Sequence, residues 1–171
     1  MYIYQDEVSL PEEKLKNLAF DWKNKSVIEL GCNIGKLGLF VLENGAESYK
    51  GYETDGEMVR IGIERYGLDI EKENVIESKK KYESDVVVAM ALFHHFKDRD
   101  LEKVIKKIQA KELIFEVPTG NNDVGLYQTR DKEYYEELIK ETYGSVEEVV
   151  ESGATNDPYN KRLIYRCKRS L

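Results

Sequence analysis

Apolar residues along this chain come in two spacings, which alternate from one end to the other. Short continuous apolar runs are typical of strands that are buried on both faces. Longer stretches with an apolar residue at every third or fourth position are typical of helices with one buried face. The pattern predicts strands at 27–30, 48–53, 75–76, 86–92, 113–117, 145–151 and 162–167, and helices at 36–44, 54–67, 98–108 and 134–142.

Alternating strands and helices predict a parallel sheet with helices on both faces. The last two strands flank a loop rich in Gly, Asn, Asp and Pro at 153–160, which predicts a hairpin that adds one antiparallel strand. The third strand, at 75–76, is weak, and the connection at 77–84 is too short for much helix, because parallel crossovers need about a dozen residues. Either this strand is marginal or the crossing runs extended.

The first 25 residues predict a leading amphipathic helix. Ser9 and Glu12 match a capping box, with Pro11 at the first helical position. We expect this segment (1–25) to pack onto a core at 26–171, which together form a single domain, because 171 residues are too few for a second domain of usual size. The expected apolar face of the helix consists of Leu15, Leu18, Ala19 and Trp22.

Charge and cysteine content narrow the functional classes. The net charge of -7 argues against a nucleic-acid partner, since binding to phosphate backbones depends on clustered Lys and Arg. The basic run at 79–81 fits a solvated connection. Cys32 and Cys167 form neither a metal-binding spacing nor a disulfide framework, which suits a reducing compartment.

No stretch has the roughly 18 apolar residues of a membrane span, and no apolar signal segment opens the chain. We therefore expect a cytoplasmic protein without a membrane partner. The sequence leaves the oligomeric state open.

A glycine-spaced loop follows the first apolar run, within Ser-Val-Ile-Glu-Leu-Gly-Cys-Asn-Ile-Gly-Lys-Leu-Gly at 26–38. Glycines let the backbone turn sharply and approach a ligand. A dinucleotide fingerprint needs glycines at the first, third and sixth positions, but counting from Gly31 the third and sixth are Asn33 and Lys36. The spacing that does occur is an acidic residue two positions before the first glycine, a second glycine at Gly35, and another acidic residue, Glu53, at the end of the next predicted strand.

This combination of Glu29, Gly31, Gly35 and Glu53 resembles motif I and the following acidic residue of the class I S-adenosylmethionine-dependent methyltransferases. The family loop commonly reads Glu/Asp-x-Gly-x-Gly-x-Gly, so Asn33 replaces its middle glycine. Asn takes a positive φ angle more readily than most residues, which makes the replacement tolerable. The resemblance implies a Rossmann-like doubly wound α/β fold with seven strands in the order 3-2-1-4-5-7-6, strand 7 antiparallel, and helices on both faces.

The same resemblance implies S-adenosyl-L-methionine as the cofactor. It implies that Glu53 binds the ribose hydroxyls, that Glu29 helps to hold the methionine part, directly or through water, and that the adenine lies near 77–78. Cys32 fits a small apolar filler better than a nucleophile. The residues expected around the cofactor are Glu29, Gly31, Cys32, Asn33, Gly35, Glu53, Thr54, Glu77 and Ser78.

Ligands of open parallel sheets bind beyond the carboxyl ends of the strands, where the strand order reverses. His94 and His95 follow the predicted central strand at this point, and an imidazole there can act as a base on the acceptor. Packing against the core or the cofactor is the alternative role for either ring. Glu116 is a further candidate base, with a structural role as its alternative. Tyr127 and Tyr159 lie in two loops that we expect to wall the acceptor pocket.

The sequence Ala-Leu-Phe-His at 91–94 stands where adenine and glutamine amino methyltransferases carry Asn/Asp-Pro-Pro-Tyr, so we expect an oxygen, ordinary amine or carbon acceptor on a small or medium-sized molecule. A second interpretation is a non-catalytic methyltransferase-like subunit that binds the cofactor and serves a partner. A dehydrogenase is disfavoured because the loop spacing contradicts it.

Overall fold

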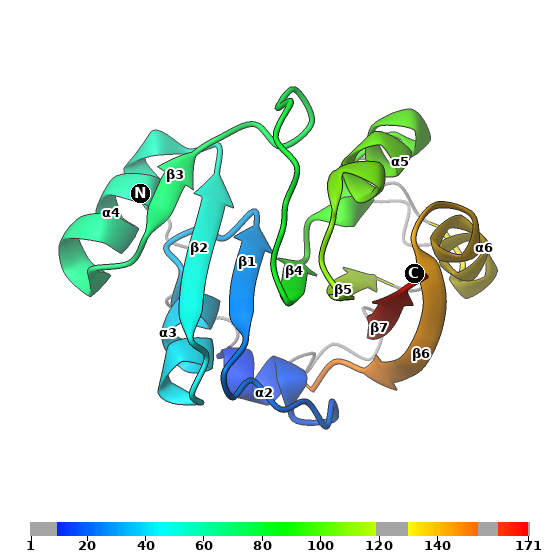
Figure 1. Ribbon diagram of the computed structural model, residues 1–171, viewed down its shortest axis with the longest axis horizontal. Coiled ribbons are helices and arrows are strands. Elements are labelled where there is room, and N and C mark those ends of the chain that lie inside the picture. Colours follow the sequence, from blue (N-terminus) through cyan, green and yellow to red (C-terminus); the bar gives the residue numbers. More distant parts are fainter. Residues whose placement is uncertain (1–9, 119–129, 154–160, 171) are drawn as a thin grey trace.

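The computed structural model describes residues 10–118, 130–153 and 161–170. Their strands form one seven-stranded sheet in the order β3-β2-β1-β4-β5-β7-β6 (Figure 1), and β7 is antiparallel to both β5 and β6. This arrangement confirms the fold predicted from the sequence. The strands are β1 (Ser26–Leu30), β2 (Ser48–Glu53), β3 (Ile70–Lys72), β4 (Val86–Met90), β5 (Glu112–Pro118), β6 (Gly144–Glu151) and β7 (Arg162–Arg169).

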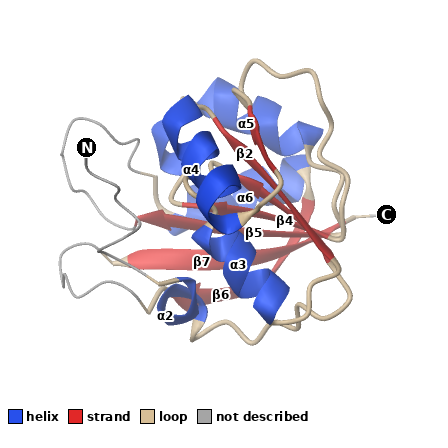
Figure 2. Cartoon of the chain, turned by 90° about the vertical axis from the view of Figure 1, so that its left-hand side faces the viewer, coloured by secondary structure: helices blue, strands red, loops and turns tan. Residues whose placement is uncertain are grey.

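Helices pack on both faces of this sheet. Figure 2 looks along the sheet from its β3 edge, with α3 and α4 nearest the viewer. Successive residues of β4 enter two separate cores: Val87 and Ala89 pack with α5 and α6, whereas Val86 and Val88 pack with α3. The helices are α2 (Pro11–Leu15), α3 (Lys36–Glu43), α4 (Gly56–Tyr66), α5 (Asp98–Lys107) and α6 (Lys132–Thr142), with a short 3-10 helix η1 (Phe93–His95) after β4.

The leading helix is shorter than predicted. Helix α2 ends at Leu15, and the chain then makes a turn in which the Leu18 amide donates to the Leu15 carbonyl. Leu15, Leu18 and Trp22 are buried as expected, but Ala19 is exposed. Tertiary contacts rather than helical periodicity hold this segment, since Trp22 packs edge-on against Phe40 of α3 with ring centroids 6.4 Å apart.

The third strand lies earlier in the sequence than predicted. Strand β3 lies at Ile70–Lys72 and pairs with β2, whereas Val75 and Ile76 lie in a turn. An edge strand with a single buried residue, Ile70, has no apolar run to mark it. The crossing to β4 contains a turn at 75–77 and no helix, and within it Tyr82 forms a parallel bridge with Ile108.

Aspartates lie at the start of two helices. Asp55 caps α4, because its carboxylate accepts hydrogen bonds from the amides of Glu57 and Met58. Asp98 is the first residue of α5, and its carboxylate pairs with Arg130.

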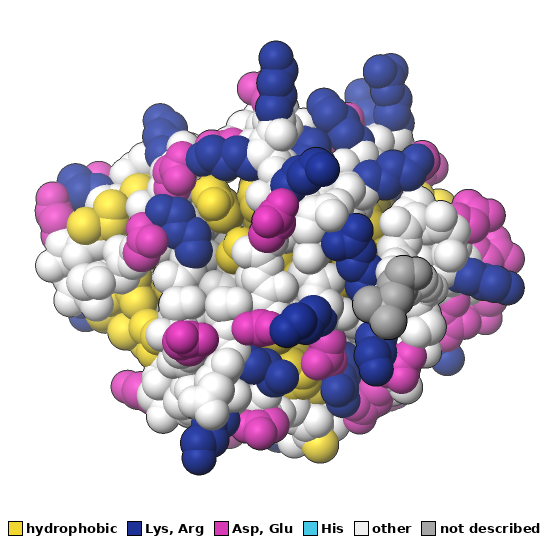
Figure 3. All heavy atoms as spheres, in the orientation of Figure 1, with side chains coloured by type: hydrophobic (Ala, Val, Ile, Leu, Met, Phe, Trp, Pro, Cys, Tyr) yellow, Lys and Arg dark blue, Asp and Glu magenta, His cyan; other side chains and the backbone are white. Residues whose placement is uncertain are grey.

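Lys/Arg and Asp/Glu side chains are interspersed over the face shown in Figure 3. Within the described ranges, no helix has the length and apolar character needed to cross a membrane.

Gly38 allows helix α3 to lie directly over Tyr49 of β2. A Cβ atom at Gly38 would fall 2.5 Å from Cε1 of the Tyr49 ring, which is almost fully buried. The close approach brings the Tyr49 hydroxyl to the end of β1, where it meets Glu29.

We expect Gly38→Ala to destabilise the protein. The intrinsic helical gain of about 1 kcal/mol is outweighed by overpacking, which typically costs about 1–3 kcal/mol in a dense core. Gly56→Ala is the matched control, because a Cβ there meets only the flexible Lys72 side chain, with Nζ at 3.3 Å. Urea unfolding of both variants checks this, and equal stability of the two would contradict it.

Candidate functional site

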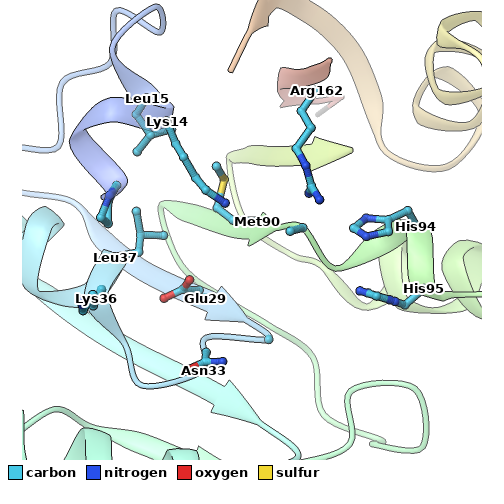
Figure 4. Close-up of a pocket in the computed structure, with 13 residues that line it drawn as sticks. Lys14, Leu15, Glu29, Asn33, Lys36, Leu37, Met90, His94, His95 and Arg162 are labelled. Atoms are coloured by element: carbon cyan, nitrogen blue, oxygen red, sulfur yellow. The ribbon is translucent and has the colours of Figure 1, made fainter. Parts of the chain in front are cut away.

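A cavity of about 360 Å³ opens beyond the carboxyl ends of β1 and β4. Its walls come from α2, the loop after β1, the start of α3, the residues that follow β4, and the first residue of β7 (Figure 4). The cavity therefore lies where the strand order reverses, as expected for an open α/β sheet.

The glycine-spaced loop forms one wall. Gly31, Asn33 and Gly35 all have positive φ angles, of 71°, 52° and 81°. Asn33 thus adopts the backbone conformation expected of the glycine that it replaces, and its side-chain oxygen accepts from the Ile34 amide at 2.8 Å. Gly31 and Asn33 line the cavity.

Glu53 ties this loop to the end of β2. Its Oε2 accepts from the Asn33 amide at 2.8 Å, and its Oε1 accepts from the Thr54 amide and hydroxyl and from the Asp55 amide. A carboxylate accepts about four hydrogen bonds, two on each oxygen. Oε2 therefore retains capacity for a hydroxyl donor, although Glu53 and Thr54 are not among the residues that line this cavity.

Glu29 is a buried acid in the cavity wall. Its exposed fraction is 2%, and the Tyr49 hydroxyl donates to its Oε2 at 2.6 Å. Burial raises the pKa of Glu29 to about 8, while the Tyr49 hydrogen bond and the charge of Lys14 act in the opposite direction. The group is therefore mostly protonated at neutral pH and would ionise beside a cation.

Cys32 lies fully buried behind the loop, next to Gly51. Burial raises the pKa of its thiol, which keeps the group protonated. Such a thiol packs as a small apolar side chain.

The two histidines lie together on η1, in the opposite wall of the cavity. His94 is buried and His95 is exposed, and their ring centroids are 4.2 Å apart. Burial lowers the pKa of His94 to about 3, with a further contribution from neighbouring positive charges. Burial and the charge of Arg162 lower the pKa of His95. Both imidazoles are therefore mostly neutral at pH 7, and the low pKa makes the buried His94 a weak base.

Arg130 holds η1, the short helix that carries both histidines, in place. No sequence motif identified Arg130 for this role. Its side chain is only 5% exposed and donates to the carbonyl of Phe96 at 2.6 Å and to the carbonyl of Phe93 at 3.4 Å. Its Nε also donates to Asp98 at 2.8 Å. These contacts tie both ends of η1 to the start of α6.

Glu116 lies behind the cavity rather than in its lining. It is fully buried in β5, and its Oε1 accepts from the Ser152 hydroxyl at 2.6 Å. Its Oε2 pairs with Lys14 Nζ at 3.2 Å and with Arg162 Nη1 at 3.4 Å. Lys14 and Arg162 themselves line the cavity, and no motif in the sequence marked them.

The other predicted residues lie away from this cavity or outside the described residues. Glu77 and Ser78 lie in the turn after β3, where both amides donate to the Asn74 carbonyl. Tyr127 and Tyr159 fall outside the described residues, so their predicted contacts stay untested. Met90 and Ala91 line the cavity, and sequence reasoning did not select them.

A family model described as a methyltransferase domain matches residues 2–143 of the chain. A comparison with curated proteins finds no match. Solved structures of similar fold include 1,6-didemethyltoxoflavin-N1-methyltransferase from Burkholderia thailandensis, with bound 1,6-didemethyltoxoflavin and S-adenosylhomocysteine. Its TM-score is 0.79 at 11% identity, over 99% of this chain and 81% of that chain.

Two further structures share the fold. Magnesium protoporphyrin IX methyltransferase from Synechocystis, with bound S-adenosylmethionine, has a TM-score of 0.70 at 16% identity, over 88% of this chain and 72% of that chain. A protein from Listeria monocytogenes described as a candidate S-adenosylmethionine-dependent methyltransferase has a TM-score of 0.75 at 16% identity, over 94% of this chain and 98% of that chain. At these identities the similarity is one of fold.

The raised pKa of Glu29 predicts a specific pH dependence of stability. The folded protein binds a proton at Glu29 between pH 4.5, the ordinary value, and about 8, whereas the unfolded chain releases it. Stability contributed by this group should therefore fall as pH rises through that window, by up to about 1.4 kcal/mol per pH unit.

Glu29→Gln should remove this slope, and Glu43→Gln, at an exposed carboxylate, should leave it unchanged. Urea unfolding of the ligand-free proteins from pH 5 to 8 measures the effect. Parallel curves for the wild type and Glu29→Gln would show that Glu29 titrates normally.

Proposed function

Because this chain belongs to the family of methyltransferase domains, we propose that it transfers the methyl group of S-adenosyl-L-methionine to a small or medium-sized acceptor. The observation that carries this proposal is that one cavity joins Glu29 and the glycine-spaced loop to the two neutral histidines. Glu29 and the glycine-spaced loop suit a nucleoside with a cationic amino-acid end. The two histidines suit a reacting acceptor.

Two acidic side chains, Glu29 in the cavity wall and Glu53 at the end of β2, fit the proposed cofactor. Glu29 is a buried acid in the wall, and a cationic ligand beside it would lower its pKa and gain an ionic partner. Glu53 would accept from ribose hydroxyls through Oε2, while its other oxygen keeps the Thr54 turn in place. When bound, S-adenosylmethionine supplies an activated methyl group, so the protein contributes mainly positioning and exclusion of water.

The acceptor side needs a group that takes up a proton when the acceptor has a high pKa. His95 lines the cavity and reaches solvent, so it can take this proton and pass it to water. His94 packs against it and is buried, which suits a role in holding the His95 ring. Glu116 is engaged with Lys14, Arg162 and Ser152, so we assign it a supporting role.

We expect S-adenosylhomocysteine to stabilise the protein in a thermal melt, whereas nicotinamide dinucleotides do not. Ligand at a hundred times its dissociation constant adds about 2.7 kcal/mol by mass action. Its affinity should rise from pH 6 to 8, because Glu29 must ionise to face the ligand ammonium, and Glu29→Gln should bind more weakly without this pH dependence. Stabilisation by a dinucleotide alone would refute the assignment.

His95→Gln should lower methyl transfer to the best acceptor found in a screen by about 100-fold, the lower range for a lost general base. Wild-type kcat/KM, which reports the free enzyme, should be flat at neutral pH and fall only at a pH below the usual histidine pKa of about 6.5, since the pKa of His95 is lowered. The affinity for S-adenosylhomocysteine should change little. A steep loss of turnover in His94→Gln, with normal turnover in His95→Gln, would assign the role of the base to His94. Cofactor binding without turnover on any acceptor would favour the non-catalytic interpretation.

A further inference from the structure

Three charged side chains with an excess of one positive charge lie together at the cavity. Glu116 is fully buried and contributes one negative charge, while Lys14 and Arg162 reach it from α2 and from the first residue of β7. Both cations are mostly buried, with side-chain exposures of 16% and 21%. Their distances to Glu116 Oε2, 3.2 and 3.4 Å, show that they share a single oxygen.

We propose that Lys14 and Arg162 bind a carboxylate, or an anionic group of similar geometry, that the methyl acceptor carries. This inference rests on the proposed transferase function and specifies the class of its acceptor. Partly buried cations are stable when anions balance them. Among the described residues, Lys14 and Arg162 form ion pairs with Glu116, which balances only one of the two. An anionic group in the cavity would supply the missing charge.

The geometry directs both cations at the same space. In Figure 4 the Lys14 and Arg162 side chains extend toward the centre of the cavity from two different elements, with His94 and His95 beside them. An Arg side chain has five donors in a planar fork, and the contact with Glu116 involves only Nη1. The rest of the fork can form the paired hydrogen bonds that guanidinium makes with carboxylates.

The charge of the cavity wall is opposite in sign to the net charge of the whole chain. The net charge of the protein is -7, yet the wall of the cavity contains both Lys14 and Arg162, and Glu29 is the one acid among the described residues that line it. Glu29 is itself mostly protonated at neutral pH. A local positive field in an acidic protein favours an anionic ligand at this position.

An anion at this site would also act on the proposed base. The positive charge of Arg162 lowers the pKa of both His94 and His95. A carboxylate against Arg162 offsets that charge and makes His95 a stronger base when the acceptor is in place.

A carboxylate could also come from the amino-acid end of the cofactor. Lys14 lines the cavity from α2, and its charge acts on both Glu29 and His94. Arg162 instead belongs to the β5–β7 side, where it pairs with Glu116. Arg162 is therefore the residue that distinguishes the two sources.

The first experiment measures anion binding to the protein saturated with S-adenosylhomocysteine. Acetate and benzoate are compared with acetamide and benzamide by calorimetry and thermal melts. We expect the acids to bind at least tenfold more tightly than the amides, and Arg162→Met to abolish the difference. Arg166→Met is the matched control, because Arg166 lies on the same strand and pairs with Glu112 instead. Equal binding of acids and amides, or equal loss in the control, would overturn the proposal.

The second experiment identifies the source of the anion. S-Adenosylhomocysteine is compared with 5′-methylthioadenosine, which lacks the amino-acid end, in the wild type and in Arg162→Met. We expect Arg162→Met to leave the ratio of the two affinities within twofold. A tenfold loss for S-adenosylhomocysteine alone would assign the site to the cofactor carboxylate and overturn the proposal. Failure of both nucleosides to bind the wild type would refute the transferase function instead. In that case, binding of acetate and benzoate to the ligand-free protein would still test the anion site at Lys14 and Arg162.

Two further variants keep the test decisive if Arg162→Met folds poorly. Arg162→Lys keeps the charge but loses the fork, and we expect it to retain part of the preference for acids. Glu116→Gln keeps the shape but removes the internal anion, so benzoate should bind several-fold more tightly. Weaker benzoate binding in a folded Glu116→Gln protein would show that the cations serve only to balance Glu116.

Discussion

The site depends on how the fold accommodates two buried carboxyl groups. Glu29 and Glu116 lie in β1 and β5, the two neighbours of β4 in the sheet, and each is almost fully buried. A buried acid must either stay protonated or find a partner of opposite charge. Glu29 takes the first course, with Tyr49 as its hydrogen-bond partner, and Glu116 takes the second.

The partners of Glu116 bring distant parts of the chain to one side of the sheet. Lys14 lies 102 positions before Glu116, and Arg162 lies 46 positions after it. Helix α2 is held there by backbone contact as well, because the Gly153 amide donates to the Lys14 carbonyl. The ion pairs that balance a buried acid thus also build two walls of the cavity.

Features set by local pattern could be predicted from the sequence, and features set by long-range contact could not. The alternation of strands and helices follows from the apolar pattern, and the strand order follows from the resemblance to the methyltransferase family. Asn33 takes its positive φ because its own side chain supports the turn. Strand β3 was misplaced because an edge strand with one buried residue, Ile70, carries almost no apolar signal. The leading helix is shorter than predicted because the burial of Trp22, which suggested a helical face, comes from aromatic rings beyond the end of α2.

Lys14 and Arg162, the two cations that pair with Glu116, show how far prediction from the sequence can be extended. Glu116 interrupts an otherwise apolar strand, Leu-Ile-Phe-Glu-Val at 113–117, so the sequence alone requires a cation or a proton for it. Among 26 basic residues, however, only the folded topology selects Lys14 and Arg162. A partner found by this route has no motif, yet it faces the ligand cavity because the acid that it balances lies directly behind the cavity wall. Buried acids near the carboxyl ends of central strands are therefore a guide to cavity-lining cations that motif comparison misses.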